Sequence, residues 1–341
     1  MHADSSRPVL PLAIGGHGES VQSLGLADKS ERTEGIAYSP SGNILAVATS
    51  DTNTVYLYRR KSGGRFETTP SSKLSGPESR LNYPHDIAFA SCGNDDLMAV
   101  AQRAGAITVY RRNDGEPMYG PAPVWEISGP QSKLKFSDGV AFVPPHDRCL
   151  AVCNLETSTI SFYRQTSASP VRFALKPAFQ LRHPSVGQPD GLGFSRCGRW
   201  LAIANHGKHT VSIFRRRPRL FSWSKVKYGP RPVTVLDDPS LRYPHSVAFT
   251  PETNHLVVTN AGANYFSVYE PMGRGRETRW SRSPVAKTIV GQEATFREVN
   301  ARNKMEGGPK GIAIHSDGIA VCSPEHGVKI FALHENANGW A

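Results

Sequence analysis

Six copies of one short phrase are spread along the chain, each with a small or polar residue ahead of an alternating apolar run. The copies are "TEGIAY" from Thr33, "PHDIAF" from Pro84, "SDGVAF" from Ser137, "PDGLGF" from Pro189, "PHSVAF" from Pro244 and "PKGIAI" from Pro309. They recur every 51 to 65 residues. A period near 50 with several short strands per unit is typical of a propeller blade.

Each unit contains the pattern of a four-stranded antiparallel sheet. In the first unit, a strand at 36–38 is followed by the turn "SPSGN", the apolar run "ILAVATS" and the alternating run "TVYLYRR". Later units add a fourth run in the linker that follows, at 124–128, 178–182, 233–237 and 286–290. Four such strands make one blade, so the sequence predicts an all-β, six-bladed β-propeller.

The last unit ends after "VKIFALH" without a fourth strand, while the unclaimed run "VQSLGL" at residues 21–26 precedes the first unit. We expect this N-terminal strand to complete the sixth blade and close the ring, because closure removes an exposed sheet edge. The predicted organisation is an N-terminal extension at 1–20 and one propeller domain at 21–341. The alternative is five blades with an unrelated tail.

Several classes of protein are disfavoured by what the sequence lacks. There is no run of about 18 apolar residues and no N-terminal secretory pattern, so we expect no membrane partner and a cytoplasmic location. The five cysteines have no paired metal spacing, which favours reduced structural thiols. Gly-rich phosphate loops, nucleophile elbows and metalloprotease motifs are missing, so we expect no organic cofactor.

The innermost strand of a blade begins beside the central channel, and a polar residue stands at this position in every unit. The six residues are Glu34, His85, Asp138, Asp190, His245 and Lys310. We expect them to converge, with His85 opposite His245 and Lys310 opposite Asp138. The acids would repel one another unless a cation or a proton joins them, and without a metal they would raise the proton affinity of the two imidazoles.

The phrases "TEGIAYSP", "SDGVAF" and "PDGLGF" resemble those of six-bladed propellers of the gluconolactonase and senescence-marker type, and more widely the NHL-repeat and YVTN-type propellers. This resemblance implies a single divalent cation (Ca²⁺, Mn²⁺ or Zn²⁺) held by Glu34, Asp138 and Asp190. It also implies a lactonase-like hydrolase acting on a lactone or ester, with His85 or His245 as general base or acid. The chain departs from the pattern at these two histidines, since the family has an acid at the fifth position.

Further polar residues follow the second strands, on the same side of the ring as the channel mouth. We expect Asn154, Asn205, His206 and Asn260, together with Lys310, to bind a small polar molecule there. A purely structural alternative stays open. In it the histidines hydrogen-bond to neighbouring strands and the acids accept backbone N–H groups across the channel.

The chain carries a net charge of +11, and its linkers after the third strands are strongly basic. The segment 215–231, "RRRPRLFSWSKVKYGPR", interleaves cations with aromatic residues, a mixture that suits nucleic acid or another polyanion. A solvated basic edge is the plainer interpretation. The competing function is therefore a non-catalytic scaffold that binds a partner protein or polyanion through its top face or this basic rim.

Overall fold

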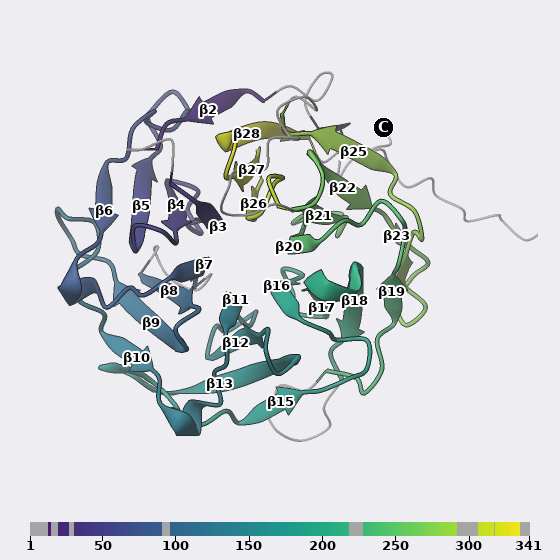
Figure 1. Cartoon of the computed structure of the whole chain (residues 1–341), viewed down its shortest axis with the longest axis horizontal. Coiled ribbons are helices and arrows are strands. Elements are labelled where there is room, and N and C mark those ends of the chain that lie inside the picture. Colours follow the sequence, from purple (N-terminus) through teal and green to yellow (C-terminus); the bar gives the residue numbers. More distant parts are fainter. Residues whose placement is uncertain are drawn as a thin grey trace, which may run out of the picture.

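The computed structural model shows six β-sheets arranged as blades around one axis (Figure 1). It describes residues 13–14, 20–26, 31–90, 96–217, 228–291, 306–316 and 318–334. Each blade has four antiparallel strands, which follow sequence order from the axis to the rim in the first five blades, while the outermost strand of the sixth comes from the N-terminal part of the chain. The predicted all-β, six-bladed propeller is confirmed.

The strands fall into four concentric sets. The innermost are β3 (Thr33–Tyr38), β7 (Pro84–Phe89), β11 (Ser137–Phe142), β16 (Pro189–Phe194), β20 (Pro244–Phe249) and β26 (Ile312–His315). The second are β4 (Ile44–Thr49), β8 (Leu97–Gln102), β12 (Cys149–Asn154), β17 (Trp200–Asn205), β21 (Leu256–Asn260) and β27 (Gly318–Ser323). The third are β5 (Thr54–Arg59), β9 (Ala106–Arg111), β13 (Thr159–Ala168), β18 (Thr210–Arg215), β22 (Tyr265–Tyr269) and β28 (Gly327–His334). The outermost are β6 (Ser72–Leu74), β10 (Trp125–Ile127), β15 (Phe179–Leu181), β19 (Thr234–Leu236), β25 (Ala286–Ile289) and β2 (Gln22–Leu24).

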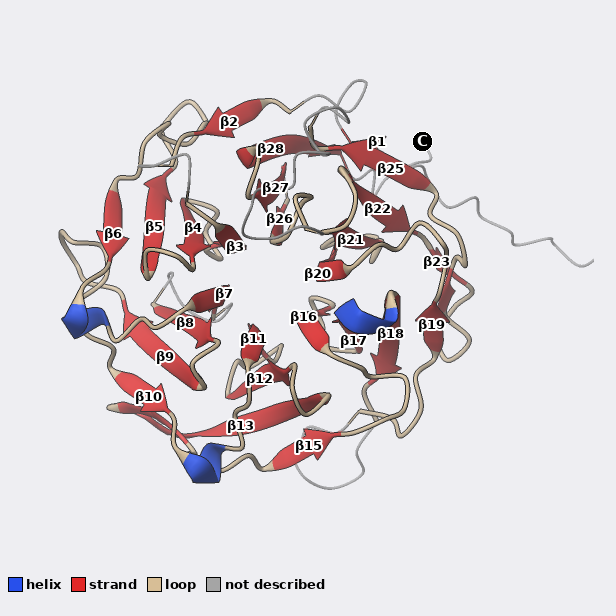
Figure 2. Cartoon of the chain, in the orientation of Figure 1, coloured by secondary structure: helices blue, strands red, loops and turns tan. Residues whose placement is uncertain are grey.

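Some short elements lie outside this plan. β14 (Val171–Phe173) adds a strand to the third blade, and β23 (Pro271–Met272) pairs with β24 (Arg279–Trp280) beside the fifth. The helical pieces among the described residues are short 3₁₀ turns (Figure 2). No helix in this part of the chain is both long and apolar enough to cross a membrane.

The N-terminal strand closes the ring, as predicted. β2 pairs antiparallel with β28, and Gln22 lies opposite Ile330 and Leu24 opposite Val328. β1 (Ala13–Ile14), which falls within the predicted extension, pairs with the far end of the same strand. Sheet hydrogen bonds therefore join the first and last parts of the chain.

Apolar side chains fill the junction between each pair of neighbouring blades. At the junction of the first and second blades, Ala46 and Leu57 pack with Ile87 and Met98. Comparable clusters occupy the other five junctions, including the one where Leu24 joins the sixth blade to the first. The second strands are buried along their whole length because a blade covers each of their faces.

The innermost strands have a shared irregularity that positions the site. In the first five blades, the pairing of the inner strand with the second strand shifts register close to the polar residue that was predicted to line the channel. Such a bulge re-aims a side chain. Glycine follows this residue in four blades, and the inner strands approach one another there: a Cβ at Gly191 would lie 2.4 Å from the carbonyl oxygen of His245 in the next blade.

In the second and fifth blades, Asp86 and Ser246 stand where the other blades have this glycine. Asp86 contacts the third blade, since its Oδ2 accepts the backbone N–H of Val140 at 2.9 Å. Burial raises the pKa of Asp86 to about 7, and the backbone hydrogen bonds only partly oppose that effect.

Candidate functional site

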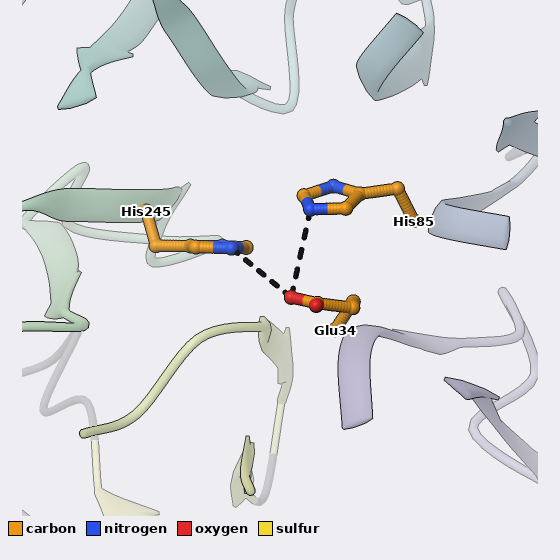
Figure 3. Close-up of side chains that lie close together, drawn as sticks. All are labelled: Glu34, His85 and His245. Atoms are coloured by element: carbon orange, nitrogen blue, oxygen red, sulfur yellow. Dashed lines mark ion pairs between the residues drawn. The ribbon is translucent and has the colours of Figure 1, made fainter. Parts of the chain in front are cut away.

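The six predicted channel residues do converge on the axis, and all of them are buried. They are Glu34, His85, Asp138, Asp190, His245 and Lys310. The imidazoles of His85 and His245 come from opposite blades and stack, with ring centroids 5.1 Å apart and an angle of 23° between the planes. Figure 3 shows both rings directed toward Glu34. Neither ring points outward into a blade interface.

Glu34 is surrounded by cations and imidazoles. Its Oε2 accepts a hydrogen bond from Lys310 Nζ at 2.9 Å and lies 3.5 Å from His85 Nε2 and 3.4 Å from His245 Nε2 (Figure 3). Arg32 pairs with the other carboxylate oxygen. Burial by itself would raise the pKa of Glu34, but the Lys310 ammonium and the nearby imidazoles outweigh it and hold the pKa well below its usual range. Glu34 is therefore an ionised and well-compensated carboxylate.

Lys310 comes from the blade opposite that of Asp138, as expected, but its side chain pairs with other residues. Its ammonium contacts Glu34 in the neighbouring blade and also Glu306, at 3.1 Å from Oε2. Asp138 pairs instead with Arg103, whose Nε and Nη2 lie 2.7 and 3.3 Å from its Oδ1 and Oδ2. The ion pairs form between groups that the backbone already places side by side.

Asp138 and Asp190 are two buried acids on adjacent blades. His85 Nδ1 lies 3.8 Å from Asp138 Oδ1 and 3.7 Å from Asp190 Oδ1. Burial, with the neighbouring Asp190 charge, raises the pKa of Asp138 to about 8 despite Arg103. This pair of acids is therefore less well compensated than Glu34.

The expected rise in imidazole proton affinity is wrong for His85. Burial disfavours the charged ring, the Arg103 guanidinium adds to that effect, and together they lower the pKa of His85 well below its ordinary value despite Glu34. His85 is thus a neutral imidazole with one lone pair available.

Four partly exposed side chains form an upper layer over this buried cluster, and we call them the mouth groups. They are Arg32, Arg103, His206 and Glu306, with side chains 12–19% exposed. His206 Nε2 lies 2.9 Å from Glu306 Oε1, and its Nδ1 lies 3.4 Å from Asp190 Oδ2. Burial opposes the charge on His206, but the Glu306 hydrogen bond and the Asp190 charge prevail and raise its pKa.

The sequence pattern identified His206 among the mouth groups and missed the other three. One signal was available for Arg103: like His206, it directly follows a second strand, β8 or β17. Arg32 lies two residues before Glu34, in the same inner-strand approach. Glu306 belongs to the long connection between the fifth and sixth blades, which has no counterpart in the repeat.

Four residues near the mouth have a left-handed backbone conformation, and each stands two positions before a channel residue in the sequence. They are Tyr83, Phe136, Gln188 and Tyr243, with φ between 47° and 60°. Aromatic residues rarely adopt this conformation. The backbone N–H of Tyr83 donates to Asn53 Oδ1 of the preceding blade at 2.6 Å, and that of Tyr243 donates to His209 Nδ1 at 3.1 Å, so the strained turns are held by neighbouring blades.

Aromatic rings from these turns contact the mouth groups. The Tyr243 ring lies 5.1 Å from that of His206, and the Arg103 guanidinium lies 5.8 Å from the centroid of Phe136. Phe136 is 47% exposed. The mouth therefore has both apolar and charged surfaces.

The three asparagines predicted to bind ligand lie at the ends of their second strands, but they are buried and bonded within their own blades. Asn154 is representative: its Oδ1 accepts the N–H of Lys135 at 3.1 Å and its Nδ2 donates to Ser161 Oγ at 3.0 Å. Asn205 and Asn260 make equivalent bonds. These contacts give them a structural role.

Two sets of side chains have the geometry of a metal site, and both include His85. One is Glu34, His85 and His245, and the other is His85, Asp138 and Asp190; within each set, one ligand atom per residue lies within 4.8 Å of the others. The set that the resemblance implied, Glu34 with Asp138 and Asp190, is not among them for the described residues. A neutral imidazole with carboxylates is a suitable donor set for Zn²⁺ or Mn²⁺.

The basic segment at 215–231 lies mostly outside the described residues, which stop at 217 and resume at 228. Its polyanion-binding role stays a prediction.

Comparisons with known proteins support the fold and leave the family open. No family model matches the chain, and no curated protein matches it. Among solved structures, it is similar to the β-propeller domain of Cps50 (Swd1) from Myceliophteria thermophila, with a TM-score of 0.56 and 13% identity over 88% of this chain and 82% of that one. Likeness at this identity shows the fold alone, so the resemblance to gluconolactonase, NHL-repeat and YVTN-type propellers stays a prediction.

Proposed function

We propose that the protein binds a small polar molecule at the channel mouth, above the stacked imidazoles. The observation that carries this proposal is the layered charge at the axis: six buried polar groups lie beneath four mouth groups that still reach solvent. Burying an ion costs several kcal/mol even after relaxation, so a purely structural axis would be more stable with apolar side chains. Clusters of shifted pKa values favour a functional site.

The charge of the mouth favours a ligand with an anionic end. Arg103 uses Nε and Nη2 on Asp138, and its Nη1 makes no hydrogen bond within the described part of the chain. Burial lowers the pKa of His206, but Glu306 and Asp190 outweigh burial and raise it. A carboxylate can accept a hydrogen bond from Arg103 Nη1, while ligand hydroxyls can donate to Glu306. The aromatic rings of Phe136 and Tyr243 offer surfaces for the carbon skeleton.

The ligand class that fits these groups is a small hydroxylated carboxylate. Hydrolysis of a sugar lactone yields such a compound, so the lactonase-like chemistry expected from the resemblance is compatible with this site. Catalytic roles for His85 and His245 stay predictions. Both rings lie beneath the mouth, and His206 is the imidazole nearest to the proposed ligand.

Binding can be tested with gluconate as the probe and sorbitol as its uncharged counterpart. Saturating gluconate should raise the Tm of the protein, since a ligand at 100 times its Kd stabilises the folded state by about 2.7 kcal/mol. Sorbitol should not. Arg103→Gln should weaken gluconate binding at least tenfold, because it removes a charge-assisted contact. Arg196→Gln is the matched control, since Arg196 is an exposed arginine paired with Glu252 on the surface.

Lactone hydrolysis by the protein can be measured separately, by titrating in a pH-stat the acid released from glucono-lactone. Gluconate binding without such release would mean binding without catalysis. A protein whose Tm is unmoved by any small carboxylate, or whose gluconate affinity survives Arg103→Gln, would contradict the proposed mouth site.

A further inference from the structure

The two candidate metal sets share one side chain, His85, which enters each through a different ring nitrogen. Nε2 faces Glu34 Oε2 at 3.5 Å, and Nδ1 faces the Oδ1 atoms of Asp138 and Asp190 at 3.8 and 3.7 Å. His85 is 1% exposed, and its Nε2 has no hydrogen-bond partner. A buried imidazole with carboxylates within 4 Å of both ring nitrogens has the arrangement of a metal-bound histidine, in which one nitrogen faces the ion and the other faces a second carboxylate.

Charge balance distinguishes the two sets. Glu34 already has two protein cations in contact, Lys310 and Arg32. A divalent ion there would lie beside the Lys310 ammonium. Only one arginine, Arg103, lies beside the pair of Asp138 and Asp190, and it contacts Asp138 alone. The excess of negative charge is therefore on the Asp138 side of His85.

The surrounding groups also orient the two aspartates. Arg103 holds Asp138 from the mouth side, and His206 Nδ1 lies 3.4 Å from Asp190 Oδ2. The Oδ1 atoms of both residues face His85 Nδ1, and that of Asp138 also accepts the hydrogen bond from Arg103 Nε, so it would be shared between the guanidinium and an ion. On the far side of the ring, Glu34 can accept a proton from Nε2, which would fix the tautomer with the lone pair on Nδ1. Metal-bound histidines commonly have a carboxylate on the other ring nitrogen in this way.

We infer that His85 Nδ1, Asp138 Oδ1 and Asp190 Oδ1 bind a divalent cation at the floor of the channel mouth. In tetrahedral coordination with bonds of about 2.0–2.2 Å, neighbouring ligand atoms are roughly 3.3–3.6 Å apart. The observed 3.7 and 3.8 Å require a closure of a few tenths of an ångström. One nitrogen and two carboxylate oxygens favour Zn²⁺ or Mn²⁺ over Ca²⁺, which takes six to eight oxygen ligands.

This assignment keeps two of the residues that the family resemblance implied and replaces Glu34 with His85 as the third ligand. Glu34 becomes a positioning residue that acts through the imidazole. The inference does not require the proposed ligand at the mouth, because its evidence lies in the buried groups beneath it.

The test is metal binding by protein produced without a polyhistidine tag. After dialysis against metal-free buffer, elemental analysis should find close to one Zn or Mn per chain. Chelator-treated protein should bind Zn²⁺ with a rise in Tm and a 1:1 calorimetric titration. Asp190→Asn and His85→Gln should each lose at least 100-fold in affinity. Glu34→Gln should lose about 10- to 100-fold, as is usual for the partner of a metal-bound histidine.

Asp96→Asn is the matched control, since Asp96 is an exposed carboxylate paired with Arg111. It should leave metal content unchanged. Near-UV circular dichroism of each variant checks that the fold is retained, and the Tm shift of the wild-type protein provides a readout that does not depend on any variant. Wild-type protein that neither retains nor binds an ion would overturn the inference. So would a metal whose affinity is abolished by Glu34→Gln and unaffected by Asp190→Asn, since that result assigns the ion to the set of Glu34, His85 and His245.

Discussion

The axis of the propeller and the junctions between its blades are equally buried, but they contain opposite chemistry. The junctions contain Leu, Ile, Val, Ala and aromatic side chains, such as Leu57 against Ile87. The axis contains ionisable groups at six successive positions, with Lys310 fully buried. Apolar burial contributes roughly 1.5–3 kcal/mol per large side chain. Buried ions contribute little net stability even when they are well paired.

This difference indicates which region maintains the fold and which one serves another purpose. The junctions form a closed circle of apolar contacts, and these contacts do not involve the side chains at the axis. The buried charges at the axis are compensated by one another, so the loss of one partner leaves the other charge unpaired. Substitutions in the two regions should differ in the way their effects combine.

The largest effect should follow from opening the circle itself. Deleting residues 1–27 removes β2. It takes Leu24 out of the apolar cluster between the sixth and first blades and leaves the edge of β28 unpaired. We expect a loss on the order of the whole folding stability, 5–15 kcal/mol, with aggregation through the free edge. Urea unfolding followed by circular dichroism measures it. A deletion of residues 1–19, which keeps β2, should be far milder, and equal effects of the two deletions would contradict the assigned role of β2.

At the axis, Lys310→Met should lower the free energy of unfolding by about 3–5 kcal/mol, because Glu34 is left buried with one cation fewer. The double variant Glu34→Gln with Lys310→Met should be more stable than the Lys310→Met single variant. Chemical denaturation of wild type, Lys310→Met, Glu34→Gln and the double variant gives the coupling energy. Simple additivity would mean that this ion pair is not a coupled unit.

In a junction, Leu57→Ala should cost about 2–5 kcal/mol by leaving a cavity between the first and second blades. Leu57→Met keeps the volume and should cost less than about 1.5 kcal/mol. Unlike the axis variants, these should leave metal content unchanged. Loss of metal in Leu57→Ala protein that remains folded would show that the two regions are not independent.

The smallest expected effect is at the boundary between the two regions. Gly191→Ala would place a methyl group 2.4 Å from the carbonyl oxygen of His245, so the inner strands must separate. We expect a cost of about 1–3 kcal/mol. Gly63→Ala is the control, since a Cβ there has nothing within 4 Å. If both variants melt at the same temperature, the close approach of the inner strands is less tight than described.

The repeat contained enough information to predict the fold and the six axis positions, because strand order in a propeller determines which residue begins beside the channel. It also predicted the ring closure, since a missing strand at one terminus and a surplus at the other have one economical solution. The pairing of His85 with His245 followed from counting blades.

The partners of these residues were not predictable in the same way. Arg32, Arg103 and Glu306 lie outside the repeated phrase, and Glu306 comes from a connection that only one blade has. The proton affinity of His85 depends on the sum of burial and several charges, and the position of Arg103 was needed to obtain its sign. Local pattern gives the position of a residue along a strand, whereas ionisation depends on neighbours in three dimensions.

The stacked imidazoles give the axis an approximate twofold symmetry. Rotation by half a turn exchanges His85 with His245 and places Glu34 over Asp190, an acid over an acid. It also places Asp138 over Lys310, and there the symmetry fails. A symmetric axis would offer two equivalent half-sites to a visiting cation. Because the sixth blade places its own ammonium in one half-site, the two halves of the axis are unequal: the half with Asp138 and Asp190 is the acidic one, and it is where the proposed ion would bind.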